Sequence, residues 1–289
     1  MDIVLFGEDV FTATVLQSLL EKNHHVLLIV CPLYSNNNHK KLQSIAEQNK
    51  IEFIREEDIN SGFVKKRLEK AQPDLLVSVH LRKILKKEIF SIPGKGAINV
   101  HPSLLPKYRG LSPQHQAIIH GDSESGVTVH YIEEAVDTGK ILIQISIPIE
   151  KEDYISDFQF KMQEVYKQIV TDAIDRIADE NFEPVEQKIE ETSYFGSLKT
   201  EDRKIDFAKT GTEALNLIRA VSYPYKGAYF GKFKIWRAEI PDENTVKAYS
   251  NSHTETGIHL IDEEVILLRF KGGILISDDF ELIENEDSI

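Results

Sequence analysis

The sequence is poor in the features that mark secreted, membrane-spanning and metal-binding proteins. Its single cysteine, Cys31, can form neither an internal disulfide nor a cysteine-rich metal site, and it follows the apolar run VLLIV as a small buried side chain would. No apolar run approaches the roughly 18 residues that a membrane helix needs. The N-terminus, MDIVLFGEDVF, lacks a basic leader and a small-residue cleavage site. These absences favour a cytoplasmic location and no membrane partner.

Several catalytic signatures are missing as well. The sequence has no G-x-S-x-G nucleophile elbow and no Walker A phosphate loop. Gly7 follows the first apolar run but does not belong to a G-x-G-x-x-G pattern, so a dinucleotide cofactor is not expected. Neither His-x-x-x-His nor Cys-x-x-Cys occurs, and the histidines show no metal-ligand spacing, so we expect no metal.

The sequence also has fewer basic than acidic residues. Lysine and arginine number 34 against 47 acidic residues, which gives a net charge of −13. From this charge balance alone, we expect no nucleic-acid partner. The balance places no limit on a small anionic substrate, which needs only a few local cations or a helix N-terminus.

The first half of the chain alternates between apolar runs and helix-like segments. The helix-like segments are 9–22, 39–49, 61–71 and 82–91, and the apolar runs are IVLF (3–6), VLLIV (26–30), IEFI (51–54), LLVSV (75–79) and AINV (97–100). Strands that alternate with helices indicate a parallel sheet covered on both faces. We therefore predict an α/β fold with a Rossmann-like, mostly parallel sheet, whose ligands lie beyond the carboxyl ends of the strands.

The pattern changes in the second half. VTVHYI (127–132) and ILIQISIPI (141–149) read as paired strands, and one long amphipathic helix is predicted over 155–179. After a short helix at 211–222, turn residues separate strand-like runs, TVKAYS (245–250) among them, which indicates a small β-barrel. The predicted division is a catalytic domain over 1–190, a polar linker over 191–204 and a C-terminal domain over 205–289.

The stretch INVHPSLLPKYRG (98–110) carries the most informative polar residues. Asn99 and His101 alternate with Val100, so on a strand both side chains project from one face. An imidazole exchanges a proton near neutral pH, and an amide N–H can donate to an oxyanion, which together suit acyl transfer. From these residues alone, a hydrogen-bonded structural asparagine and a solvated histidine remain the alternative.

A carboxylate that would orient the imidazole is expected further along the chain. The candidate is Asp137, in EAVDTGK between the two paired strands, although Asp-Thr-Gly is also an ordinary turn sequence. His80 and His130 could approach the same place from strand ends.

Together these residues resemble the formyltransferase family that uses 10-formyltetrahydrofolate. The resemblance rests on the Asn-x-His, the Ser-Leu-Leu-Pro that follows it, and GDSESGVTVHYIEEAVDTGKIL (121–142), and it covers about residues 1–190. SYFGSLKTEDRKIDF (193–207) and LIRAVSYPYKGAYF (217–230) resemble the C-terminal domain shared by the methionyl-tRNA and amino-arabinose formyltransferases. That resemblance implies an OB-like barrel and argues against the purine enzyme, which lacks this domain.

The resemblance also implies the site. It makes Asn99, His101 and Asp137 a catalytic triad, with N10-formyltetrahydrofolate as co-substrate. The pterin is expected against main-chain groups of two segments, Lys83, Ile84 and Leu85 in the first and Glu133, Glu134, Ala135 and Val136 in the second. In one respect the chain departs from the family: Leu111 stands where the amino-arabinose enzymes have an arginine assigned to folate contact.

Two substrates fit the resemblance. The first is the amine of a nucleotide-linked amino-deoxy sugar, as in lipopolysaccharide and O-antigen biosynthesis, and the second is methionyl-tRNA. The loop CPLYSNNNHKKLQ (31–43) is short and mostly polar, whereas the tRNA enzymes typically carry a longer basic loop there, so we favour the sugar. Relatives often pair, so a homodimer is conceivable by analogy. The candidate substrate contacts are Ser103, Lys107, Tyr108 and Arg109, with Arg219, Tyr223, Tyr225 and Trp236 as further candidates against a plain structural role.

Overall fold

The computed structural model describes residues 1–34, 38–250 and 253–283, and the chain divides into two compact units. Unit 1 comprises Met1–Leu111, Ser125–Ile147 and Phe160–Phe195. Unit 2 comprises Ser112–Glu124, Pro148–Gln159 and Gly196–Ile289. The domain boundaries given above remain a prediction. Within the described ranges, no helix has the length and apolar character needed to cross a bilayer.

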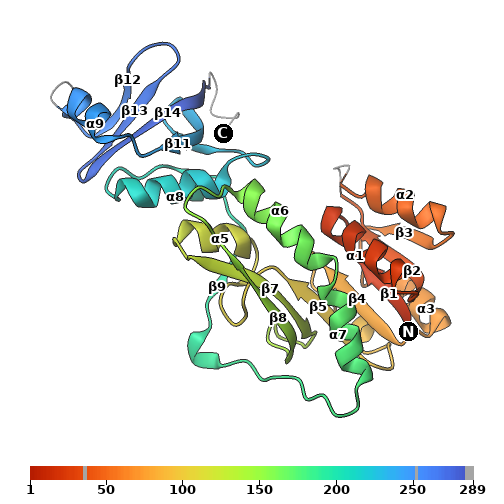
Figure 1. Ribbon diagram of the computed structural model, residues 1–289. Coiled ribbons are helices and arrows are strands. Elements are labelled where there is room, and N and C mark those ends of the chain that lie inside the picture. Colours follow the sequence, from red (N-terminus) through yellow and green to blue (C-terminus); the bar gives the residue numbers. More distant parts are fainter. Residues whose placement is uncertain (35–37, 251–252, 284–289) are drawn as a thin grey trace. The chain divides into compact units, whose positions relative to one another are not determined.

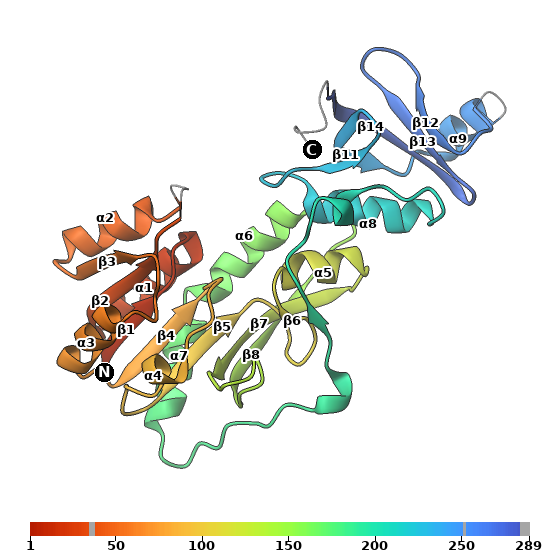
Figure 2. The ribbon, with the colours of Figure 1, turned by 180° about the vertical axis from the view of Figure 1, so that it is seen from behind.

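A seven-stranded sheet with the order β3-β2-β1-β4-β5-β7-β8 forms the centre of unit 1 (Figures 1 and 2). Its strands are β1 (Asp2–Phe6), β2 (His25–Pro32), β3 (Glu52–Glu56), β4 (Leu75–Val79), β5 (Ala97–His101), β7 (Glu124–Tyr131) and β8 (Ile141–Pro148). The first five pair in parallel, and β7 runs antiparallel to β5. The predicted Rossmann-like, mostly parallel sheet is thereby confirmed.

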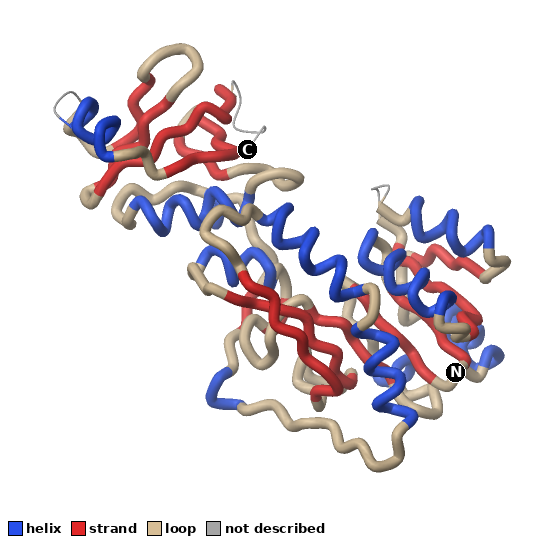
Figure 3. Tube along the Cα trace, in the orientation of Figure 1, coloured by secondary structure: helices blue, strands red, loops and turns tan. Residues whose placement is uncertain are grey.

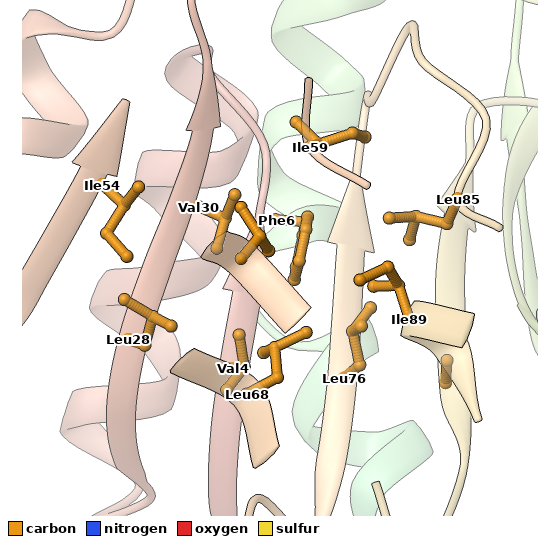
Figure 4. Packing of buried hydrophobic residues seen from close by; sticks show 12 residues of the cluster. Val4, Phe6, Leu28, Val30, Ile54, Ile59, Leu68, Leu76, Leu85 and Ile89 are labelled. Atoms are coloured by element: carbon orange, nitrogen blue, oxygen red, sulfur yellow. The ribbon is translucent and has the colours of Figure 1, made fainter. Parts of the chain in front are cut away.

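Helices cover both faces of this sheet because its strands are apolar on both sides. Along β1, Val4 and Phe6 belong to a buried cluster with Leu68 of α3 and Ile89 of α4 (Figure 4). The alternate residues of β1 project to the opposite face, which α1 covers (Figure 1). The helices of this half are α1 (Val10–Glu21), α2 (Lys40–Gln48), α3 (Gly62–Ala71) and α4 (Lys87–Phe90).

The long helix predicted over 155–179 is two helices, α6 (Ile155–Tyr166) and α7 (Ile169–Ala178). The chain tightens at the junction, where the Lys167 and Gln168 amides donate to carbonyls three residues back. The Lys167 carbonyl accepts from the Ser18 hydroxyl of α1, which accounts for the break. The apolar face is as predicted, with Phe158, Met162 and other residues of the stripe buried.

Unit 2 is built on a five-stranded antiparallel sheet with the order β10-β11-β14-β13-β12 (Figure 3). Its strands are β10 (Ala228–Phe230), β11 (Phe233–Glu239), β12 (Gly257–Leu260), β13 (Ile266–Phe270) and β14 (Gly273–Leu282). The sheet is curled, which confirms a small barrel-like C-terminal domain. Unit 2 also contains α5 (Pro113–Ile119), which the sequence patterns missed, and α8 (Gly211–Val221).

One strand prediction in unit 2 is wrong. Residues 245–250, TVKAYS, belong to α9 (Glu243–Ser250), although they are rich in residues that favour strands. The Asp242 side chain accepts from the Thr245 amide at 2.8 Å, and its carbonyl accepts from the Val246 amide. This N-terminal capping outweighs the strand propensity of the segment.

Candidate active site

Asn99 and His101 lie at the carboxyl end of β5, between β4 on one side and β7 on the other. In the strand register Asn99 is opposite His130 of β7, and His101 is opposite Thr128. The Asn99 amide nitrogen lies 3.3 Å from His130 Nε2. The alternation predicted from the sequence therefore brings the amide and the imidazoles to one edge of the sheet, where ligands bind in such folds.

Asp137 follows β7 and reaches the same place. Its two carboxylate oxygens each lie 3.5 Å from an imidazole nitrogen, Oδ2 from His101 Nδ1 and Oδ1 from His130 Nε2. Oδ2 also accepts from the Gly110 amide at 2.8 Å. Asp137 has a left-handed backbone with φ 54°, and a Cβ at Gly139 would lie 1.8 Å from the Tyr131 carbonyl oxygen. The Asp-Thr-Gly turn thus has the shape that presents the carboxylate to both rings.

The electrostatics of this group favour a charged carboxylate. Burial opposes ionisation of Asp137, but His101, His130 and the Gly110 amide together lower its pKa to about 2. Burial lowers the pKa of His101, and the Asp137 carboxylate opposes that shift. An imidazole, a carboxylate and an amide N–H at one sheet edge can exchange a proton and stabilise a developing oxyanion.

The turn after β5 is stabilised by buried side chains and by a hydrogen bond within the turn. Ser103 is fully buried, and its hydroxyl donates to the Lys107 carbonyl at 2.7 Å, so this predicted substrate residue lies within the turn. Tyr108 is also buried, with a left-handed φ of 59°. Its carbonyl lies 2.9 Å from His101 Nε2, and its amide donates to Ser193 Oγ. Among these predicted contacts, Lys107 is the one with an exposed side chain.

Arg109 is tied to the Asp137 loop through Gln187. Its guanidinium donates to Gln187 Oε1 from Nε at 3.2 Å and from Nη2 at 2.6 Å. The Gln187 amide in turn donates to the Asp137 and Gly139 carbonyls at 2.9 and 2.7 Å. Just beyond, β9 (Tyr194–Phe195) pairs in parallel with β6 (Arg109–Gly110). Sequence analysis missed Gln187 and placed β9 in a linker, since nothing in that polar stretch marks either.

An exposed ion pair links Glu134 of the second segment predicted to hold folate to Lys87, two residues beyond the end of the first segment. In the first segment the Ile84 side chain is 67% exposed, whereas Leu85 belongs to the buried cluster. The Ile84 carbonyl accepts from Asn60 at 3.0 Å. In the second segment the side chains of Glu133, Glu134 and Ala135 are exposed, and that of Val136 is half-buried.

A second polar group lies at the carboxyl ends of β1 and β4. His80 follows β4 with φ 49°, and its ring nitrogens lie 2.8 Å from Asp9 Oδ2 and 2.7 Å from the Tyr166 hydroxyl. Burial raises the pKa of Tyr166 well above its ordinary value. His80 follows the end of β4 and links the N-terminus of α1 to α6 through these two contacts. The segment that contains Lys83 begins three residues later in the chain.

The four further candidates belong to unit 2 and have partners there. Arg219 is buried and donates to the Asp153 and Glu150 carbonyls, as a structural residue would. The rings of Tyr223 and Trp236 stack with centroids 4.1 Å apart. The Tyr225 hydroxyl accepts from the Gln159 amide at 2.6 Å.

Metal-ligand geometry is not found in the parts of the chain that the structure describes: no group of three or more His, Cys, Asp or Glu side chains there could hold a metal ion.

Comparison with protein families gives the site its context. The model of the formyl transferase family matches residues 1–174, and that of the formyl transferase C-terminal domain matches residues 197–282. This chain belongs to the formyl transferase family. The chain is therefore a formyltransferase, as the resemblance predicted.

Relatives of this formyltransferase include methionyl-tRNA enzymes and sugar enzymes. Methionyl-tRNA formyltransferase of Halalkalibacterium halodurans is 32% identical over 83% of this chain and 78% of its own length, and that of Thermodesulfovibrio yellowstonii is 33% identical over 84% and 81%. The N-formyltransferase from Helicobacter canadensis, solved with folinic acid and dTDP-3-aminofucose, is 25% identical, with a TM-score of 0.75 over 96% of this chain and 99% of its own. WlaRD, a sugar 3N-formyl transferase, shares the fold with a TM-score of 0.75 at 22% identity over 97% of each chain.

Proposed function

We propose that this formyltransferase moves a formyl group from N10-formyltetrahydrofolate to the amine of a nucleotide-linked amino-deoxy sugar. The observation that carries the proposal is the grouping of Asn99, His101 and Asp137 at the carboxyl ends of the strands. Asp137 lies 3.5 Å from the rings of His101 and His130, and Asn99 lies 3.3 Å from His130. The likeness to the Helicobacter canadensis enzyme, solved with a folate and a dTDP-linked amino sugar, supports the choice of substrates.

The folate co-substrate supplies a formyl carbon that an amine attacks, so negative charge develops on the formyl oxygen and a proton must leave the attacking nitrogen. When the tetrahedral adduct collapses, the bond between the formyl carbon and N10 breaks, N10 takes up a proton, and tetrahydrofolate leaves. The Asn99 amide donates an N–H to that oxygen. One such donor stabilises the transition state by about 3 kcal/mol. His101 acts first as the base that takes the amine proton, and the imidazolium so formed then stabilises the negative charge on the oxygen electrostatically, since its Nε2 is held by the Tyr108 carbonyl and its Nδ1 faces Asp137. The Asp137 carboxylate stabilises the imidazolium. The low pKa of Asp137 keeps this carboxylate ionised at neutral pH.

The segments at Lys83–Leu85 and Glu133–Val136 are proposed to hold the pterin. The Ile84 side chain is apolar and 67% exposed, so contact with a flat aromatic ring would remove apolar surface from water. Through the Lys87–Glu134 ion pair, the second segment lies next to the residue that begins α4, just after the first segment. With Leu111 in place of the arginine expected from the amino-arabinose enzymes, the remaining part of the folate needs a different partner.

Lys107 and Arg109 are the proposed contacts for the anionic part of a nucleotide sugar. Lys107 has an exposed side chain in the turn that follows His101. The Arg109 guanidinium is held by Gln187 through two of its nitrogens, which leaves its geometry defined rather than mobile. The Tyr108 carbonyl holds the His101 ring by its hydrogen bond to Nε2, and the Ser103 hydroxyl stabilises the turn by donating to the Lys107 carbonyl.

Methionyl-tRNA is the second candidate substrate. The tRNA enzymes among the relatives reach 33% identity, against 25% for the Helicobacter canadensis enzyme. Against tRNA stand the net charge of −13 and the segment over 31–43, from the end of β2 to the first turn of α2, in which Lys40 and Lys41 are the only lysines and there is no arginine. Residues 35–37 of this segment lie outside the described part of the structure.

Formation of tetrahydrofolate with a panel of acceptors tests the proposal. The panel contains 3-amino and 4-amino sugars linked to dTDP, UDP and GDP, together with methionyl-initiator tRNA. We expect turnover with one of the nucleotide sugars, and loss of that turnover in the His101→Ala variant. Turnover confined to the tRNA would overturn the proposed substrate, and a His101→Ala variant within a few-fold of the parent would overturn the proposed triad.

A further inference from the structure

His130 lies between Asn99 and Asp137, although the proposed reaction gives it no role. Its side chain is 2% exposed and projects from β7 opposite Asn99 of β5. The Nε2 atom lies 3.3 Å from the Asn99 amide nitrogen and 3.5 Å from Asp137 Oδ1. A buried imidazole that contacts two of three proposed catalytic residues can influence the reaction without touching a substrate.

The hydrogen-bond partners of the ring determine which of its nitrogens carries the proton. His130 Nδ1 lies 2.8 Å from the Tyr131 carbonyl oxygen. A carbonyl oxygen only accepts, so Nδ1 must carry a hydrogen and donate it. In the neutral ring Nε2 then has a lone pair and accepts, which makes the neighbouring Asn99 group a donor.

This assignment settles the orientation of the Asn99 amide. Because His130 Nε2 accepts, Asn99 must present its NH₂ group to it rather than its oxygen. The NH₂ group has two hydrogens, and fixing one of them on His130 fixes the direction of the other. A preorganised donor stabilises an oxyanion more than one that must rotate into place.

A proton on Nε2 would reverse this arrangement. The ring would then donate to Asp137 Oδ1 and could no longer accept from Asn99. His101, whose ring centroid is 6.4 Å from that of His130, competes for the same carboxylate through Oδ2.

We propose that His130 is a positioning residue that accepts a hydrogen bond from Asn99 through Nε2 and so aims the second N–H of that amide at the formyl oxygen. This inference rests on the proposed role of Asn99 as the oxyanion donor. His130 itself contacts neither the formyl group nor the amine.

Two substitutions separate this role from a purely structural one. His130→Leu removes the acceptor, and His130→Gln retains one, because the end of a glutamine side chain reaches about as far as Nε2. We expect His130→Leu to lower kcat by on the order of tenfold to a hundredfold, below the full effect of losing an oxyanion donor. The KM for folate should change by less than about threefold, and His130→Gln should recover most of the lost kcat.

Val127→Ala provides the matched control for damage to the strand. Val127 is fully buried in the same strand and carries no polar group, so its truncation destabilises β7 without removing the acceptor. We expect this variant to unfold more easily while its kcat stays near that of the parent.

A double-substitution cycle with Asn99→Leu tests whether His130 acts through the amide. If it does, His130→Leu should have almost no further effect on kcat in a chain that already lacks Asn99. Multiplicative losses would overturn the inference, as would a His130→Leu variant with the kcat of the parent. The single variant Asn99→Leu separates a failure of the proposed function from a failure of this inference. If Asn99→Leu keeps its activity, the proposed role of Asn99 as oxyanion donor is wrong. If Asn99→Leu loses activity and His130→Leu does not, only the proposed role of His130 is wrong.

Discussion

Replacing Asp137 with asparagine removes one negative charge from the site and little else. Asp137 has φ 54°, in the left-handed region that asparagine tolerates better than most residues. An asparagine side-chain oxygen can still accept from the Gly110 amide, as the carboxylate does at 2.8 Å. The substitution therefore removes the carboxylate charge beside the His101 and His130 rings while it keeps the hydrogen bond to Gly110.

The magnitude follows from the pKa. Although burial opposes ionisation, the Asp137 pKa falls from 3.8 to about 2 because of the two imidazoles and the Gly110 amide. This difference corresponds to about 2 kcal/mol of folding free energy. Since the folded pKa lies below the unfolded one, the stabilisation is complete above the unfolded value and is lost as the pH falls through the folded value. We expect Asp137→Asn to be less stable at neutral pH by up to about 2 kcal/mol, because the retained Gly110 hydrogen bond accounts for part of the shift, with the difference narrowing between about pH 4 and pH 2.

Urea unfolding of both proteins across this pH range measures the difference. Far-UV circular dichroism follows both units, whereas fluorescence follows Trp236, the only tryptophan of the chain, which lies in unit 2. A shift confined to the circular dichroism transition would place the loss in unit 1. Equal stability at neutral pH, or a difference that is as large at about pH 3 as at neutral pH, would refute the reasoning.

Three further substitutions have defined outcomes. Asn99→Leu should lower kcat by on the order of a hundredfold to a thousandfold with little change in the folate KM, measured by tetrahydrofolate formation. Gly139→Ala should lower the melting temperature and abolish activity, because its Cβ would lie 1.8 Å from a main-chain oxygen, whereas the control Gly196→Ala, with nothing within 4 Å, should keep both. Tyr166→Phe removes the hydroxyl that lies 2.7 Å from His80 Nε2, and urea unfolding should detect a loss of about 1–3 kcal/mol; unchanged stability would show that the contact contributes nothing.

The first five strands could be predicted because each depends on a local pattern, whereas the triad was predicted from the family resemblance. Apolar runs of strand length mark β1 to β5, and the alternation of Asn99 and His101 follows from strand geometry alone. Asp137 came from a resemblance, since its turn sequence is equally ordinary elsewhere. The break between α6 and α7 could not be predicted, because it depends on a contact between Lys167 and Ser18 that no pattern within the helix records.

The contacts that complete the site depend on register and on distant segments of the chain. His130 is opposite Asn99 only because β7 runs antiparallel to β5 in one register, and a shift by one residue would turn it to the other face. Gln187 reaches Arg109 from 78 positions along the chain, out of a polar stretch just before the predicted linker. Yet that residue binds both the arginine and the main chain on either side of Thr138. The geometry of the proposed carboxylate is therefore set by residues whose sequence context carries no sign of it, which is why patterns locate the catalytic groups more readily than the groups that hold them in place.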